Sequence, residues 1–173
     1  MDVRKEDEPT PMKSRTTVER KSERELVITR TVNGPARLVF QAWTTPELVK
    51  KWWTPRSAPM KLVTCEIDLR PGGRYRYVFD WEGHPSFEAF GKFIEVTPPS
   101  RIVWTNDEQP TGEQAVSTVT FEEKAGKTLV SMTEVYPTKE ALEAALASGA
   151  MEGTRETFDQ LDEFIDGLAA SPS

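Results

Sequence analysis

Short β-rich runs alternate with turn residues over residues 60–136, and a long amphipathic pattern follows them. The six runs are rich in Val, Ile, Thr and aromatic residues, and Pro/Gly clusters around residues 71–73 and 98–99 separate them. Strands joined by such short turns pair with their neighbours in an antiparallel sheet. Near the C-terminus, apolar residues recur at three- and four-residue steps, which predicts a helix with one buried face. Its apolar residues are Phe158, Leu161, Ile165 and Leu168.

Three shorter elements are predicted before this sheet. Residues 26–31 form a β-rich run, which predicts the first strand. Pro35 suits the first turn of a helix over residues 36–44, and Thr45-Pro46 opens a second short helix that ends at Trp52 or Trp53. The predicted fold class is therefore α+β, with a sheet of about seven strands, two short helices after the first strand, and a long C-terminal helix interrupted near Gly149 and Gly153.

The chain is expected to form one domain behind a polar tail. Residues 1–23 are charged, contain two prolines and have almost no large apolar side chains. Such a segment cannot bury enough surface to offset the entropy of ordering, so we expect a flexible tail over 1–23 and a domain over 24–170. Met12 is an alternative to Met1 as the first residue. A chain of 173 residues with 37% hydrophobic content supports one sizeable core.

Composition argues against several classes of partner. The chain has one cysteine, Cys65, and one histidine, His84. We therefore expect no internal disulfide, no metal and no cofactor. From residue 25 onward fifteen Lys/Arg face twenty-two Asp/Glu, which disfavours nucleic acid as a partner. Because no apolar stretch approaches the ~20 residues of a membrane span and the first residues lack the apolar block of a secretory signal, we expect a cytoplasmic protein with no membrane partner.

Five segments resemble, in order and spacing, landmark segments of the homologues of the activator of heat-shock-chaperone ATPase. They are AWTTPELVKKWWTP, DLRPGGRYRY, GKFIEVTPPSRIVWT, VTFEE and YPTKEALEAALASGAMEGTRETFDQLDEFI. The resemblance covers roughly residues 24–168. It implies the helix-grip fold of the START-related (SRPBCC) superfamily, in which a curved sheet wraps around the last helix and leaves a cavity between them. Nothing in the chain resembles the extra N-terminal domain through which the eukaryotic activator contacts the chaperone.

One predicted strand carries a face of aromatic residues. Because side chains alternate along a strand, Tyr75, Tyr77, Phe79 and Trp81 share one face. Two interpretations stay open: the rings fill the core, or the two tyrosines line a pocket and offer their hydroxyls to a polar ligand.

The last predicted strand places a carboxylate beside apolar residues. Val130, Met132 and Glu134 share a face, which the resemblance aligns toward the helix. Glu134 on an apolar wall would be suited to acid or base chemistry. It could instead be exposed at the sheet edge, or be paired with a buried arginine.

Trp52 and Trp53, with Trp43 one helix earlier, form the densest aromatic group. They either pack the short helices onto the sheet, or one of them closes the mouth of a pocket. Together these patterns predict a ligand site made of Trp52, Trp53, Tyr75, Tyr77, Phe79, Met132, Glu134 and Phe158.

Other features are interpreted as structural. Gly91 in mid-strand is expected to let the sheet bend, and Cys65 to act as a small buried hydrophobic residue. The charged residues of the last helix fall opposite its apolar stripe and are expected to face solvent; they are Glu152, Arg155, Glu156, Asp159, Asp162, Glu163 and Asp166.

Three functions follow as hypotheses. The first is a binding protein that holds a small hydrophobic molecule in an internal cavity. The second is a polyketide-cyclase-like enzyme that uses Glu134 with Tyr75 or Tyr77, although the sequence contains no nucleophile–base pair and predicts no catalytic residue. The third is an interaction protein that modulates a chaperone ATPase. A homodimer through exposed sheet edges is also plausible.

Overall fold

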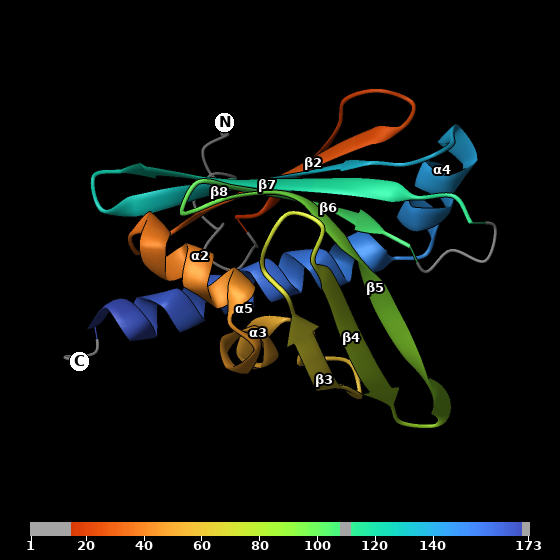
Figure 1. The fold of residues 1–173 in the computed structure, drawn as a ribbon, viewed down its shortest axis with the longest axis horizontal. Coiled ribbons are helices and arrows are strands. Elements are labelled where there is room, and N and C mark those ends of the chain that lie inside the picture. Colours follow the sequence, from red (N-terminus) through yellow and green to blue (C-terminus); the bar gives the residue numbers. More distant parts are fainter. Residues whose placement is uncertain (1–14, 108–111, 171–173) are drawn as a thin grey trace, which may run out of the picture.

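The computed structural model describes residues 15–107 and 112–170. In this part of the chain, eight strands form one antiparallel sheet in the order β1-β2-β8-β7-β6-β5-β4-β3. The sheet curves over a long helix, α5, which crosses its concave side (Figure 1). The predicted α+β helix-grip architecture is therefore confirmed. No helix among the described residues is long and apolar enough to cross a membrane.

The elements follow the predicted order, with one additional strand at the start. They are β1 (Thr17–Arg20), β2 (Glu25–Val32), α2 (Ala36–Thr44), α3 (Pro46–Trp52), β3 (Met60–Ile67), β4 (Arg74–Trp81), β5 (His84–Thr97), β6 (Arg101–Asn106), β7 (Ala115–Lys124), β8 (Lys127–Val135), α4 (Lys139–Ala147) and α5 (Ala150–Ala170). Gly149 lies between the last two helices with a φ of 82°, so the predicted break occurs there, whereas Gly153 lies inside α5.

The strand β1 corrects the predicted tail. It lies within the segment 1–23 that we expected to be flexible, and it pairs antiparallel with β2 from Thr17↔Thr29 to Arg20↔Leu26. A run of four residues with two charges carries little strand signal of its own, and the edge of β2 supplies its hydrogen-bond partners. The remainder of the predicted tail, residues 1–14, lies outside the described residues.

Helix α5 buries its apolar stripe against the sheet and α2. Phe158, Leu161 and Ile165 are each at most 2% exposed, as the three- and four-residue spacing predicted. They join a core that includes Val39 and Trp43 of α2. Burial of this stripe is the main contact that holds the helix inside the curve of the sheet.

An ion-pair cluster fixes the same helix to β2. Arg30 is 8% exposed and its guanidinium bonds the carboxylates of Asp159 and Asp162, with 2.7 Å between Nη2 and the Asp162 Oδ2. Asp162 also accepts a hydrogen bond from the backbone N–H of Asn33. The prediction that the charged residues of α5 simply face solvent is therefore wrong for these two aspartates, because strand parity turns Arg30 inward beneath them.

The long strand β5 bends where it changes partners. Its first part pairs with β4 and its last part with β6, so β3, β4 and the start of β5 diverge from the other strands in Figure 1. At the change of partner, a Cβ on Gly91 would lie 1.9 Å from the carbonyl oxygen of Thr105. The predicted bend at Gly91 thus has a steric cause, since only glycine allows this approach.

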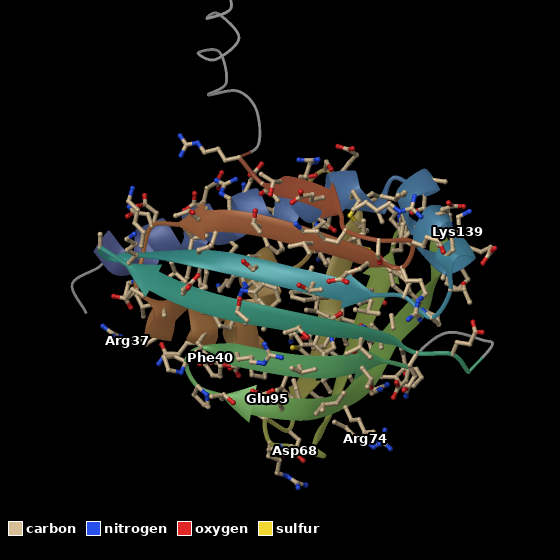
Figure 2. The ribbon with its side chains drawn as sticks, turned by 90° about the horizontal axis from the view of Figure 1, so that it is seen from above. Arg37, Phe40, Asp68, Arg74, Glu95 and Lys139 are labelled. Atoms are coloured by element: carbon tan, nitrogen blue, oxygen red, sulfur yellow. The ribbon has the colours of Figure 1, made fainter. Side chains whose placement is uncertain are left out.

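The outer face of the sheet carries both charged and apolar side chains, among them Phe90 and Leu129, which are exposed. Figure 2 looks onto this face, where Glu95 of β5 is labelled. Hydrogen bonds from the Thr97 hydroxyl and the Arg101 guanidinium, the latter at 3.1 Å, lower the pKa of Glu95. Such exposed pairs contribute little to stability.

The buried stripe makes a direct prediction for α5. Replacing Leu161 with Ala should lower the free energy of unfolding by about 2–5 kcal/mol, because it removes apolar contacts and leaves a cavity. Glu163→Ala is the control, since Glu163 is exposed and its ion pair with Arg56 lies on the surface. Urea denaturation measures both variants, and equal small losses would show that α5 does not depend on this face.

The bend of β5 makes a second prediction. Gly91→Ala should destabilise the fold by about 1–3 kcal/mol or more, because the added methyl group meets the backbone of β6. Gly167→Ala in α5 meets no atom within 4 Å and should stabilise the helix by roughly 0.5–1 kcal/mol. Thermal melts of the two variants should move in opposite directions. A Gly91→Ala protein with an unchanged melting temperature would refute the steric account.

Candidate functional site

A pocket of about 680 Å³ lies between the inner face of the sheet and the N-terminal half of α5; we call it the larger pocket. The sheet contributes Trp104, Asn106, Ser117, Met132 and Glu134, and the helices contribute Trp43, Trp52, Phe158 and the residues from Ser148 to Thr157 that face it. Trp81 and Phe87 at the end of the β4–β5 hairpin also line it. Because these two side chains are 38% and 41% exposed, the pocket communicates with solvent at the hairpin.

A second pocket of about 70 Å³ adjoins the first; we call it the smaller pocket. Tyr75 and Tyr77 line it, and it shares Trp43, Trp53, Trp104 and Asn106 with the larger pocket. The sequence predicted a single group of wall residues. In the structure the two tyrosines line the smaller pocket, and Met132 and Glu134 line the larger one. The reason is that the β4–β5 hairpin diverges from β8.

Seven of the eight predicted residues line one of these two pockets. Trp52, Trp53, Met132, Glu134 and Phe158 line the larger one. The exception is Phe79, whose ring stacks on Phe87 at 4.9 Å between centroids and lines neither pocket. Its place on the inner face of β4 was predicted correctly, but the neighbouring strand covers it.

The tryptophan cluster both packs the short helices and lines the pockets. Trp52 is 1% exposed, and its Nε1 donates to the carbonyl oxygen of Ala42 at 2.9 Å. The Trp43 ring lies 5.0 Å from that of Trp52 and 5.9 Å from that of Phe158. Among the residues that the structure describes, the Trp43 Nε1 has no hydrogen-bond partner. The cluster therefore packs the short helices and also lines the pockets, whereas closing of a pocket mouth by one of its rings stays a prediction.

A chain of hydrogen bonds crosses the sheet beside the pockets. Asn106 Nδ2 donates to Ser117 Oγ at 3.0 Å, and Ser117 Oγ donates to Glu134 Oε2 at 3.5 Å. The hydroxyl of Tyr136 donates to Glu134 Oε1 at 2.9 Å. The sheet register sets this chain, since Ser117 lies directly opposite Glu134. The carboxylate is thus oriented by neutral hydroxyl donors.

Tyr77 and Tyr136 keep their protons at neutral pH, because the pKa of each is raised. Burial, followed by the nearby charge of Glu134, raises the pKa of Tyr136. Burial also raises the pKa of Tyr77 well above its usual value. Tyr75 donates to the carbonyl oxygen of Thr105 at 2.8 Å, so its hydroxyl is bound to the backbone of β6.

Cys65 lies on β3 opposite Tyr77, which lines the smaller pocket. Burial raises the pKa of its thiol to about 11. At neutral pH the thiol is therefore protonated and a weak nucleophile. The side chain packs against the core as an apolar residue would, but it is half-buried and not buried as predicted. The described residues contain no group of three or more His, Cys, Asp or Glu side chains that could hold a metal ion.

Sequence reasoning missed several residues of the larger pocket. Ser117 shares the inner face of β7 with Val119 and Phe121, and Trp104 lies across from it on β6. Strand parity could have found both. Strand parity had already placed Trp81 on the inner face with the two tyrosines, although it was not included in the predicted site. Phe87, Glu152 and Glu156 could not be found in this way, because the curvature of the sheet and the angle of α5 bring them to the pocket.

The alternative that Glu134 is exposed at the edge of the sheet is wrong, because β8 lies between β2 and β7. Among the described residues, the buried arginine is Arg30, and it bonds the aspartates of α5. Glu134 is half-buried and lines the larger pocket.

The indole of Trp52 makes a stability prediction for the site. Trp52→Phe and Trp43→Phe remove the same number of atoms, but only the first breaks a hydrogen bond and leaves the Ala42 carbonyl without its donor. The free energy of unfolding should therefore fall by about 1–3 kcal/mol more for Trp52→Phe than for Trp43→Phe. Urea denaturation measures the difference. Equal losses would show that the Trp52 bond does not stabilise the fold.

Residues 33–166 match the family model described as Activator of Hsp90 ATPase homolog 1-like protein. Solved structures of similar fold include a Nitrosomonas europaea protein, with 28% identity, a TM-score of 0.78, and coverage of 87% of this chain and 99% of that one. A Staphylococcus epidermidis protein has 26% identity and a TM-score of 0.72, and the match covers 91% of this chain and 98% of that one.

An AHSA1-like protein from Aeromonas hydrophila has 21% identity, a TM-score of 0.63, and coverage of 85% of this chain and 98% of that one. At that identity the likeness concerns the fold alone. No curated protein matches the chain.

Proposed function

The chain belongs to the family of Activator of Hsp90 ATPase homolog 1-like proteins, and we propose that it binds a small, largely apolar molecule in the larger pocket. The observation that carries this proposal is the pocket itself. Its volume of about 680 Å³ falls within the range of roughly 300–1,000 Å³ that small-molecule sites occupy.

The walls suit such a ligand. Rings of Trp43, Trp52, Trp104 and Phe158 and the side chain of Met132 supply apolar surface. Asn106, Ser117 and Glu134 supply a few polar groups on one side. A mostly apolar site with a small number of convergent polar groups orients a ligand while deriving its affinity from burial.

A catalyst is the second candidate, and the hydrogen-bonded Glu134 is the observation that favours it. A carboxylate held by Ser117 and Tyr136 on the pocket wall is placed to exchange a proton with a bound molecule. Mass spectrometry of a bound molecule before and after incubation with the protein separates the two candidates, because a binding protein returns it unchanged.

Filling the larger pocket should abolish binding. We expect the neutral fluorescent dye N-phenyl-1-naphthylamine to bind the wild type with a rise in dye emission and a change in tryptophan emission. Met132→Trp should abolish this signal at a small stability cost, because Met132 lines an open space.

The matched control is Val130→Trp, one inward position earlier on the same strand. Val130 is fully buried and lines neither pocket, so the larger ring should cost about 1–3 kcal/mol or more through overpacking. If the wild type does not bind the dye and Met132→Trp unfolds as readily as Val130→Trp, the pocket is not a ligand site.

A further inference from the structure

The charged side chains that line the larger pocket are all acidic. They are Glu134 of β8 and Glu152 and Glu156 of α5. Among the described residues that line this pocket there is no lysine, arginine or histidine. A ligand enclosed there meets negative charge from the sheet on one side and from the helix on the other.

Two of these carboxylates are fixed by neutral donors. Glu134 accepts from the hydroxyls of Tyr136 and Ser117, and Glu156 accepts from the backbone N–H of Ser57 at 2.9 Å and from its hydroxyl at 2.6 Å. Such bonds orient a carboxylate, and a neutral donor brings no positive charge to it. The N-terminus of α5 contributes only about half a positive charge near Glu152, so the negative charge dominates.

The aromatic walls favour the same kind of ligand. Five tryptophans line the larger pocket: Trp43, Trp52, Trp53, Trp81 and Trp104. The face of an indole ring carries negative electrostatic potential and attracts cations, more strongly than the faces of tyrosine and phenylalanine do. An organic cation is attracted by the carboxylates and by each indole face that it meets, whereas a carboxylate ligand is repelled by the three carboxylates.

From these contacts we infer that the larger pocket takes an amphipathic organic cation, in which an ammonium or similar group is joined to an apolar body. The cationic group lies toward Glu134, and the body lies against the tryptophan rings and Met132. This inference rests on the proposed function, and it excludes fatty acids and other amphipathic anions as the preferred ligands.

Three ligands with the same decyl chain test the sign of the charge. Decyltrimethylammonium, 1-decanol and decanoate are titrated into the wild-type protein by calorimetry, each below the concentration at which it aggregates. The cation should bind at least roughly tenfold more tightly than decanoate, with decanol between them. Equal or tighter binding of decanoate would overturn the inference and leave the proposed function intact. If none of the three binds while the neutral dye does, the inference also fails.

Variants in which a glutamate is replaced by the neutral glutamine test which carboxylate binds the cation. Glu134→Gln should weaken binding of decyltrimethylammonium about tenfold and change that of decanol less than about twofold. Glu122→Gln is the control, because Glu122 is exposed at the far end of β7 and its loss changes the net charge equally. Thermal melts check that each variant is folded.

Glu152→Gln provides the second test should Glu134→Gln fail to fold, since Glu152 is exposed at the start of α5 and lines the same pocket. It should weaken binding of the cation and leave that of decanol unchanged. Unchanged affinity for the cation in the folded Glu134 and Glu152 variants would refute a role for the pocket charge.

Discussion

Burial of one face of α5 in the curve of the sheet is the contact on which the rest of the structure depends. The sheet presents an apolar inner face along β2, β8 and β7, and without the helix this face would be exposed to water. Phe158, Leu161 and Ile165 cover it, and the Arg30 cluster fixes the helix along its axis. Breaking a buried ion pair by removing one partner is costly, so this cluster specifies one position of α5.

The curve itself depends on a local backbone constraint. Gly91 lets β5 change partners by allowing the close approach of Thr105, and the hydroxyl of Tyr75 bonds the same carbonyl group. The β4–β5 hairpin is therefore held at a fixed angle to the other strands. A flat sheet would contact α5 along its whole length, whereas the diverging hairpin leaves space for the two pockets.

The order of elements, the inner faces of β4 and β8 and the buried stripe of α5 could all be predicted, because each depends on a local period in the sequence. The strand β1 could not, since its pairing depends on the edge of β2. The ion pairs of Asp159 and Asp162 were missed because a helical period separates apolar from polar positions and does not show which polar positions meet another element. The separation of Tyr75 from Glu134 follows from sheet curvature, which strand parity does not contain.

The N-terminal part of helix α5 lines the larger pocket, and the rest of the helix packs in the core. Leu161 and Ile165 belong to the core, Phe158 belongs to the core and also lines the larger pocket, and the inner residues from Ala150 to Thr157 face the larger pocket. Arg30 bonds the helix just past this division. Substitutions in the first two turns can therefore alter the shape and charge of the pocket while the core contacts are retained. Descendants of one ancestral chain could acquire different ligands in this way without having to evolve a new means of folding.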